Sequence, residues 1–259
     1  MSEALLQVRN VSKVFHGVTR ACDDVSLHLK AGEVLGIVGE SGSGKSTLLK
    51  CLGGMVKPDA GTIGFSMLGD RKRLDIWRLS ESERFSALRT SLGFIHQNPR
   101  DGLRLDITAG GNIAEPLMSK GVDHYGELRD VALEWLERVE IDPRRVDDLA
   151  GTFSGGMQQR LQIARNLVLR PKCLLMDEPT GGLDVSVQAR LLDLLRNIVW
   201  DLRIAVIIVT HDLAVARMLA DRLIVMRHGR IIETGLTDQI LDDPQQPYSQ
   251  LLVSSALRV

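Results

Sequence analysis

The sequence has few cysteines, no long apolar run and almost no net charge, and each scarcity excludes a class of protein. The three cysteines, Cys22, Cys51 and Cys173, form no C-x-x-C pair, which argues against a metal site and predicts reduced, buried thiols. The apolar run at 204–209 is far shorter than the roughly 20 residues that cross a bilayer. The N-terminal residues carry charges where a signal peptide needs an apolar stretch. We therefore expect a cytoplasmic protein without direct membrane insertion.

The composition is that of a globular protein. A net charge of −1 gives no overall attraction to nucleic acid, so no such partner is expected. With 259 residues, of which 44% are hydrophobic, the chain can bury a substantial core as one elaborated domain or two closely joined ones.

Residues 34–47, VLGIVGESGSGKST, have the pattern of a phosphate-binding loop: an apolar strand, a glycine-rich turn and a helix that begins near Lys45. Glycines are needed because backbone N–H groups must curl around phosphate oxygens in conformations that a Cβ obstructs. Lys45 is expected to contact the β- and γ-phosphates of a nucleotide, and Ser46 a Mg²⁺ ion. The residues expected to bind the nucleotide here are Gly39, Ser41, Gly42, Gly44, Lys45, Ser46 and Thr47.

A second apolar strand, CLLMDEPT at 173–180, ends in two carboxylates. The carboxyl ends of neighbouring parallel strands open at one edge of a sheet, so these carboxylates are expected beside the glycine-rich loop. Asp177 suits the Mg²⁺ shell. Glu178 would face the water that attacks the γ-phosphate, as general base or as orienting group. The two motifs together predict an enzyme that hydrolyses ATP.

A polar glycine turn, FSGGMQQR at 153–160, opens a further helix whose apolar positions recur at helical spacing. A single nucleotide does not need two such helix N-termini from the same chain. At this turn the sequence resembles the ATP-binding cassette (ABC) ATPases, whose signature motif meets the γ-phosphate of a nucleotide held by a partner subunit. The residues that match this signature are Ser154, Gly155, Gly156, Met157 and Gln158.

The resemblance covers essentially the whole chain and includes the remaining motifs in the order that the family shows. It implies that Gln97 is the Q-loop glutamine, with roles in catalysis and in the Mg²⁺ shell. It places Asp184, in GGLD, on the D-loop at the dimer seam, and His211, in VTHD, as the switch histidine. Phe15 stands where an aromatic side chain of the family, usually tyrosine, stacks on adenine.

The same resemblance implies an α/β fold: a P-loop NTPase (RecA-like) core with an antiparallel β layer and an inserted helical subdomain. Residues 1–97 would form the first part of the core with the β layer, 98–152 the helical subdomain, and 153–259 the signature helix, the rest of the core and a C-terminal tail. Two subunits, as a homodimer or with a related cassette, would pack head to tail around two ATP molecules. Donors aimed at the γ-phosphate act only once this dimer closes, so binding becomes closure and hydrolysis becomes opening.

Hydrophobic periodicity predicts the elements around these motifs. Strands are expected near 4–10, 25–29 and 62–68, a helical excursion over 73–90, and a strand pair over 222–234 that turns at His228-Gly229. The helix expected over 125–141 has one apolar face, formed by Leu128, Ala132, Trp135, Leu136 and Val139. Trp135 is therefore expected in the core rather than stacked on a cofactor.

The segment IHQNPRDGLRLDITAGGNI, residues 95–113, is expected to contact a partner. In transporters of this family, this region receives a coupling helix from a membrane subunit. The chain resembles the peptide-importer branch in EPTGGLDVSVQARLLDLL and DDPQQPYSQLLVSSAL, but His96 replaces the aromatic residue that usually precedes Gln97. Alternating charges suit a polar interface rim that fixes register. The candidate docking residues are Arg100, Asp101, Arg104 and Asp106.

Three functions are open, and all of them use ATP and Mg²⁺. We favour the first, because segment 95–113, HYGELRDVALEWLE and TFSGGMQQRLQIARNL resemble the cassette subunit of the bacterial carbon–phosphorus lyase system. This resemblance implies phosphonate catabolism, with soluble lyase core subunits docking near residues 97–113. The alternative is the ATP-binding subunit of a peptide, nickel or phosphonate importer. The third, an ABC protein of DNA repair or translation, usually carries paired cassettes or zinc-binding insertions, which this sequence does not have.

Overall fold

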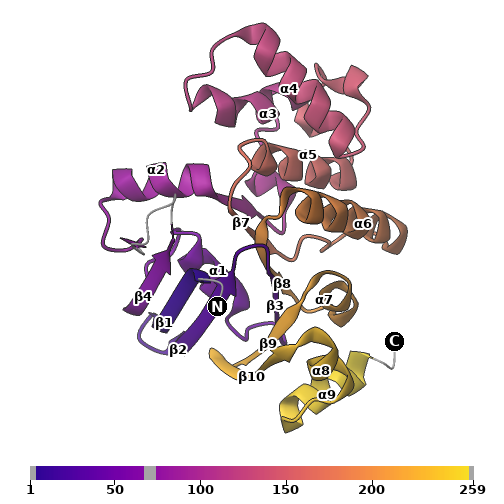
Figure 1. Cartoon of the computed structure of the whole chain (residues 1–259). Helices are drawn as coiled ribbons and strands as arrows, with labels where there is room; N and C mark the ends of the chain where they lie inside the picture. Colours follow the sequence, from indigo (N-terminus) through magenta and orange to yellow (C-terminus); the bar gives the residue numbers. More distant parts are fainter. Residues whose placement is uncertain (1–3, 67–73, 257–259) are drawn as a thin grey trace.

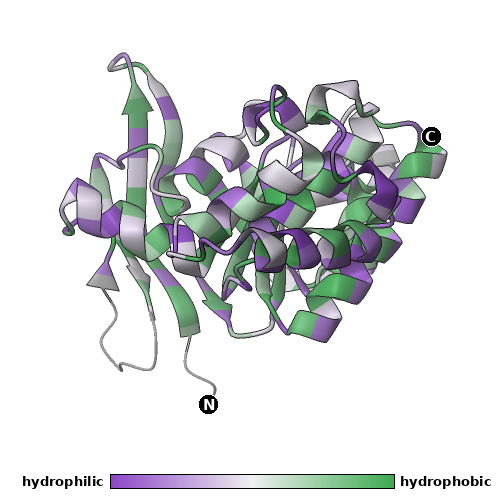
Figure 2. Ribbon diagram, turned by 90° about the horizontal axis from the view of Figure 1, so that it is seen from above, coloured by the Kyte–Doolittle hydropathy of each residue, from purple (hydrophilic) through white to green (hydrophobic). Residues whose placement is uncertain are grey.

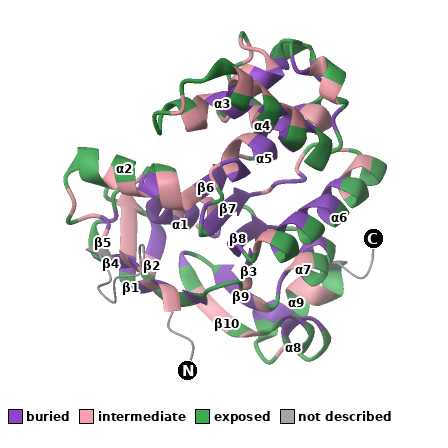
Figure 3. Ribbon diagram, turned by 45° about the horizontal axis from the view of Figure 1, so that its top comes forward, coloured by how far each residue is buried: buried purple, intermediate pink, exposed green. Residues whose placement is uncertain are grey.

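Six strands form the central sheet of the protein, whose computed structural model describes residues 4–66 and 74–256. The strand order is β10-β9-β3-β8-β7-β6, and every neighbouring pair is parallel except β9 with β10. The strands are β3 (Val34–Val38), β6 (Leu92–Ile95), β7 (Cys173–Asp177), β8 (Ala205–Thr210), β9 (Arg222–Arg227) and β10 (Arg230–Leu236). β7 and β8 are buried at every position, as parallel strands covered on both faces should be (Figure 3).

A four-stranded antiparallel sheet lies beside this core, at the lower left in Figure 1. Its order is β2-β1-β4-β5, with β1 (Ala4–Phe15), β2 (Thr19–Lys30), β4 (Ala60–Phe65) and β5 (Leu74–Asp75). The three predicted strands are confirmed, although β1 and β2 run longer than expected and residues 67–68 lie outside the described residues.

The helical prediction over 73–90 is wrong at its start. Leu74 and Asp75 pair with Phe65 and Gly64 of β4 and so extend the antiparallel sheet. Helix α2 (Glu81–Ser91) accounts for the later part of the prediction, and residue 73 lies outside the described residues.

The two faces of the central sheet pack against different layers. Leu174, Met176, Val206 and Ile208 point to α5 (Gly155–Leu167) and α6 (Val185–Leu202) in one apolar cluster. Alternate residues of the same strands join α1 (Lys45–Leu52) and the antiparallel sheet in a second cluster. This second cluster contains the three free cysteines, so their prediction as small core residues is confirmed. Figure 2 shows that hydrophobic and hydrophilic residues alternate along the helices and strands.

Between β6 and β7 the chain forms a helical part, at the top of Figure 1. It contains η1 (Pro99–Asp101), α3 (Ala109–Met118), α4 (Tyr125–Arg138), η2 (Pro143–Arg145), η3 (Ala150–Thr152) and α5. The apolar face of α4 is buried as predicted, and Trp135 is a core residue. The predicted α/β fold with an antiparallel layer and a helical part is confirmed.

Of the remaining helices, α7 (Leu213–Leu219) covers β3 and β8, and α8 (Thr237–Asp242) and α9 (Pro247–Ala256) lie at the β10 edge of the sheet. β9 and β10 turn at His228 and Gly229, as predicted, and both residues have positive φ angles of 48° and 78°. Such angles are those of a two-residue hairpin turn whose twist matches its strands.

Candidate active site

The glycine-rich loop joins β3 to α1 at the carboxyl end of the central sheet. Gly39, Gly42 and Gly44 have φ angles of 148°, 81° and 103°, which favour glycine because a Cβ would strain the backbone. A Cβ on Gly44 would lie 1.9 Å from the carbonyl oxygen of Ala21 on β2. The antiparallel sheet therefore packs directly on the loop, and α1 begins at Lys45 as predicted.

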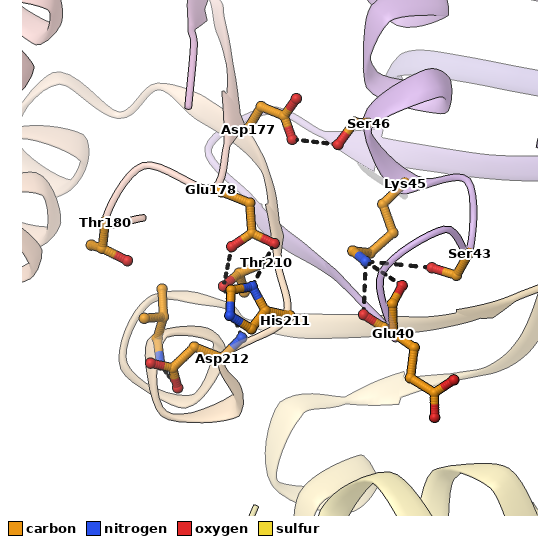
Figure 4. A network of polar contacts seen from close by, with 12 residues as sticks. Glu40, Ser43, Lys45, Ser46, Asp177, Glu178, Thr180, Thr210, His211 and Asp212 are labelled. Atoms are coloured by element: carbon orange, nitrogen blue, oxygen red, sulfur yellow. Dashed lines mark hydrogen bonds and ion pairs between the residues drawn. The ribbon is translucent and has the colours of Figure 1, made fainter. Parts of the chain in front are cut away.

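The Lys45 side chain folds back onto its own loop (Figure 4). Its Nζ donates hydrogen bonds to the carbonyl oxygens of Gly39 at 2.7 Å and Glu40 at 2.9 Å. Burial lowers the pKa of Lys45 below its ordinary value, although the nearby carboxylates of Glu178 and Asp177 act in the opposite direction. The ammonium also donates to the Ser43 hydroxyl at 3.4 Å. A buried ammonium held by neutral oxygens gains a stronger, charge-assisted partner when a phosphate arrives.

Asp177 and Ser46 bring two oxygen atoms together beside this lysine. The Ser46 hydroxyl donates to Oδ1 of Asp177 at 2.7 Å. Mg²⁺ prefers oxygen ligands and usually takes one or two from the protein and others from substrate phosphates. Within residues 4–66 and 74–256, no group of three or more His, Cys, Asp or Glu side chains could hold a metal by itself. The pair fits an ion that is shared with a bound phosphate.

Glu178 and His211 meet across the neighbouring strands β7 and β8. Nδ1 of His211 lies 2.8 Å from Oε1 of Glu178, and the Thr210 hydroxyl donates to Oε2 at 3.3 Å. Figure 4 shows this pair across from Lys45. A carboxylate held by an imidazole and a hydroxyl is oriented to accept a proton from a water molecule. The structure thus brings the predicted catalytic and phosphate-binding side chains of the core to one place.

A polar network behind His211 is not part of the sequence prediction. Gln188, on α6, donates to the Thr180 hydroxyl at 3.3 Å and to Oδ2 of Asp212 at 3.2 Å. Asp212 also caps α7, because its Oδ1 accepts from the backbone N–H of Ala214 at 2.8 Å. An Asp immediately before the first residue of a helix is a recognisable N-cap signal. This network fixes the turn that carries the histidine.

The signature turn is exposed at the N-terminus of α5. Ser154 is the N-cap residue, and its Oγ accepts from the backbone N–H of Met157 at 3.4 Å. Ser154 and Gly155 are both exposed, and a Cβ on Gly155 would meet open space. Within the described residues, no hydrogen bond joins these two residues to the glycine-rich loop of the same chain. The turn is therefore exposed and separate from the glycine-rich loop of its own chain.

Two further predicted signature residues, Gly156 and Gln158, face inward. A Cβ on Gly156 would lie 2.7 Å from a methyl group of Val187, so α6 approaches the turn closely. The Gln158 side chain is buried and donates to the carbonyl oxygen of Ala150 at 3.1 Å. Gln158 thus holds the turn from within the helical part.

Gln97, Asp184 and Phe15 lie at three exposed or half-buried positions around this site. The Gln97 side chain reaches the D-loop, since a Cβ on Gly181 would lie 3.4 Å from its Nε2. Asp184 caps α6 by accepting from the backbone N–H of Val187 at 3.0 Å, and this hydrogen bond lowers the pKa of Asp184. Phe15 is the last residue of β1. This strand pairs with β2, which packs against the glycine-rich loop.

The sequence model of the ABC transporter family matches residues 22–181. That range contains the glycine-rich loop, the carboxylates of Asp177 and Glu178 at the end of β7, and the signature turn. This chain belongs to the ABC family. The predicted family and its ATP-hydrolysing activity are confirmed, and the chain is an ABC-type ATPase.

Curated ABC relatives match over nearly the whole chain. The ATP-binding protein PhnK of Escherichia coli K12, named for phosphonates utilization, is 57% identical over 258 residues and is covered completely, as is this chain. The oligopeptide transport ATP-binding protein AppF of Bacillus subtilis is 35% identical, over 98% of this chain and 78% of its own.

Solved ABC cassettes have the same fold. A dimeric, post-hydrolysis structure of the cassette MJ0796 bound to ADP and Pi aligns with a TM-score of 0.79 and 32% identity, over 90% of this chain and 98% of its own. The cbiO1 protein of Clostridium perfringens, part of the cbiONQ transporter complex, also aligns with a TM-score of 0.79, at 30% identity over 93% and 92% of the two chains. In the part of this ABC chain that the structure describes, no helix has the length and apolarity of a membrane span.

Proposed function

We propose that this ABC ATPase acts in the cytoplasm in organic phosphonate catabolism and docks on soluble core subunits of a carbon–phosphorus lyase complex. The observation that carries the proposal is the 57% identity to PhnK over the full length of both chains. Relatives named for peptide import or oligopeptide transport share 35–37% identity and extend beyond this chain. ATP hydrolysis is the enzymatic act, and the lyase partner carries the phosphonate chemistry.

The nucleotide site is assigned to the loop and its surroundings. The backbone N–H groups of residues 39–47 cradle the phosphates, Lys45 pairs with the β- and γ-phosphates, and Phe15 stacks on adenine. Ser46 and Asp177 hold Mg²⁺, with Gln97 as a further ligand. When bound, the ion offsets the negative charge that the phosphate oxygens develop.

The hydrolytic step is assigned to Glu178 and His211. Glu178 accepts a proton from the attacking water, and His211, 2.8 Å from this carboxylate, orients it. The exposed donors of Ser154 and Gly155 complete the site of a second copy of the chain, with Asp184 at the seam. One chain alone is therefore a slow ATPase, and the head-to-tail homodimer is the active form.

The docking surface is assigned to residues 97–113, whose backbone is held firmly. Asn98 accepts from the backbone N–H of Arg100 at 3.1 Å. The fully buried Asn112 side chain accepts from the Arg104 N–H at 2.9 Å and donates to the Arg104 carbonyl oxygen at 2.9 Å. Two amide side chains thereby give this irregular segment a fixed shape without a regular strand.

Four charged side chains project from that fixed backbone, and all four are exposed: Arg100, Asp101, Arg104 and Asp106. Across residues 4–66 and 74–256, none of the ion pairs involves any of them. Charges that are not paired within the chain are free to fix the register of a polar interface. This arrangement supports docking of a partner of complementary charge.

The test is to purify the tagged protein gently from its own cells, grown with a phosphonate as sole phosphorus source. Soluble lyase core subunits are expected to co-purify with it. Reversal of both Arg100 and Arg104 to Glu is expected to abolish this association while ATP binding stays intact. Reversal of Lys120 and Arg144, two exposed cations elsewhere in the helical part, is the matched control and should leave the complex intact.

The alternative is the ATP-binding subunit of a peptide, nickel or phosphonate importer, favoured by the 35–37% identity to cassettes of peptide transport. For an importer subunit, the same experiment should yield an integral membrane protein that co-purifies from the membrane fraction. That result would overturn the lyase proposal. Unchanged docking of the Arg100 and Arg104 double variant would instead overturn the assigned surface.

A further inference from the structure

A hydrogen bond connects the C-terminal tail with the glycine-rich loop, a contact that the ATPase mechanism above does not use. The Tyr248 hydroxyl oxygen accepts from the backbone N–H of Glu40 at 3.2 Å. Tyr248 lies on α9, 208 positions further along the chain. Its ring is buried, and the Arg227 guanidinium lies 4.6 Å from the ring centroid. The hydroxyl therefore approaches the loop from a ring that packing holds in place.

The start of α9 is fixed independently of the loop. The Glu233 carboxylate, on β10, accepts from the backbone N–H groups of Gln245 at 2.8 Å and Gln246 at 3.1 Å. Tyr248 also shares an apolar cluster with Val38, the last residue of β3. The tail is thus anchored to two strands of the central sheet, next to the point where the glycine-rich loop begins.

The peptide unit between Gly39 and Glu40 is held at both ends. Its carbonyl oxygen accepts from Lys45 Nζ at 2.7 Å, and its N–H donates to Tyr248. When ATP binds, Lys45 has to share its three N–H donors between the loop and the phosphates. The bond to Tyr248 involves neither the lysine nor the phosphates, so it can persist unchanged and keep the peptide unit in place.

We propose that Tyr248 is a positioning residue that keeps the Gly39–Glu40 peptide, and with it the glycine-rich loop, in the orientation that binds ATP. The inference rests on the ATP site proposed above and adds the C-terminal tail to it. A loop that is already ordered loses less conformational freedom on binding, so the bond favours ATP binding. The Tyr248 hydrogen bond stabilises the ATP-bound ground state and the transition state equally. Its loss therefore raises KM and leaves kcat unchanged.

The test is Tyr248→Phe in the full chain, since phenylalanine keeps the ring and removes the hydroxyl alone. A hydrogen bond between neutral groups contributes about 0.5–1.5 kcal/mol net, so its loss corresponds to ATP binding that is at most roughly 2- to 13-fold weaker, with KM raised by the same factor. We expect kcat at saturating ATP to stay within about twofold of wild type. The matched control is Tyr125→Phe, at the other tyrosine of the chain, which is exposed on α4 and bonds Arg129.

Calorimetric titration with ATP, steady-state kinetics and thermal unfolding of both variants decide the outcome. Wild-type ATP affinity in Tyr248→Phe overturns the inference, and so does a fall in kcat with KM unchanged. Lys45→Ala distinguishes failure of the proposed ATP site from failure of the role of Tyr248. If that variant still binds ATP as wild type does, the proposed ATP site fails; if it loses ATP while Tyr248→Phe does not, the role of Tyr248 alone fails.

Discussion

The side-chain amide of Gln162 forms both hydrogen bonds that a neighbouring strand would form with His96. Its Oε1 accepts from the His96 backbone N–H at 2.6 Å, and its Nε2 donates to the His96 carbonyl oxygen at 3.2 Å. One turn further along α5, Asn166 accepts from the Phe94 N–H at 2.9 Å. β6 is an edge strand of the sheet, so these amides satisfy backbone groups that no strand reaches. The signature helix is thereby fixed to the strand that leads into Gln97.

Replacing Gln162 by leucine removes both bonds and leaves two backbone groups of His96 without their partner. We expect the free energy of unfolding to fall by roughly 2–6 kcal/mol, because each of the two polar groups left unsatisfied costs about 1–3 kcal/mol. The kcat for ATP is expected to fall as well, since Gln97 and the Ser154 turn are no longer held in one rigid unit. Urea denaturation and ATPase assays measure the two effects.

Gln162→Glu keeps an acceptor for the His96 N–H, but its fully buried carboxyl group has to stay charged without a partner or take up a proton, so this variant is also expected to be less stable than wild type, and more so at high pH. The matched control is Gln239→Leu, at an exposed glutamine on α8, which should change stability by less than about 0.5 kcal/mol. A leucine variant at position 162 that is as stable as the control would contradict the importance of the amide bonds.

Glu178→Gln is expected to preserve ATP binding, to slow hydrolysis by roughly 10²- to 10⁴-fold and to trap a closed dimer, because the amide cannot accept the proton of the attacking water. Gel filtration with and without ATP, beside a single-turnover hydrolysis assay, measures both properties. Glu134→Gln, an exposed carboxylate paired with Arg138 on α4, is the matched control. Hydrolysis at the native rate in Glu178→Gln would remove this residue from the mechanism.

Ser46→Ala and Asp177→Asn are each expected to raise the Mg²⁺ concentration needed for half-maximal ATP hydrolysis. Each removes or weakens one of two oxygen atoms that lie 2.7 Å apart and suit this ion. Titration of the ATPase rate with Mg²⁺ at saturating ATP provides the measurement, and nucleotide binding without Mg²⁺ serves as the check on folding. A Mg²⁺ dependence identical to that of wild type in both variants would place the ion elsewhere.

The phosphate-binding and catalytic motifs are predictable because each is a short stretch whose spacing already implies its geometry. Lys45 follows a glycine turn after an apolar strand, and Asp177 ends the apolar strand two places away in the sheet, so parallel topology alone brings them together. Gln162 and Tyr248 are different, because 66 and 208 positions separate them from their partners. Helical periodicity does not indicate which polar residue is buried, or what backbone group it meets.

Some local features could also be found from the sequence with a closer reading. Ser80 and Glu83 form a capping box at the start of α2, and that S-x-x-E pattern would set the helix to begin at Glu81. β5 is different, because a strand of two residues leaves no alternation to detect. Its pairing with β4 depends on a sheet that only the folded chain contains.

His96 is expected to make the stability of the fold depend on pH. Its ring lies 4.7 Å from that of Phe94, and burial lowers the pKa of His96, although the carboxylates of Asp101 and Asp177 act in the opposite direction. The folded chain therefore binds this proton less readily than the unfolded chain. The stability that neutral His96 contributes is complete above the ordinary histidine pKa of about 6.5 and is lost as the pH falls through the lowered value.

His96→Phe keeps a ring against Phe94 and cannot be protonated, so the variant should lose less stability than wild type between about pH 7.5 and about pH 5. Urea denaturation at both pH values measures the two losses, and their difference isolates His96 because the other titrating groups are shared. His28→Phe, at an exposed histidine on β2, should behave as wild type. Equal losses in wild type and His96→Phe would contradict this account. A smaller loss would place an acid-sensitive residue directly before Gln97, between the nucleotide site and the proposed docking surface.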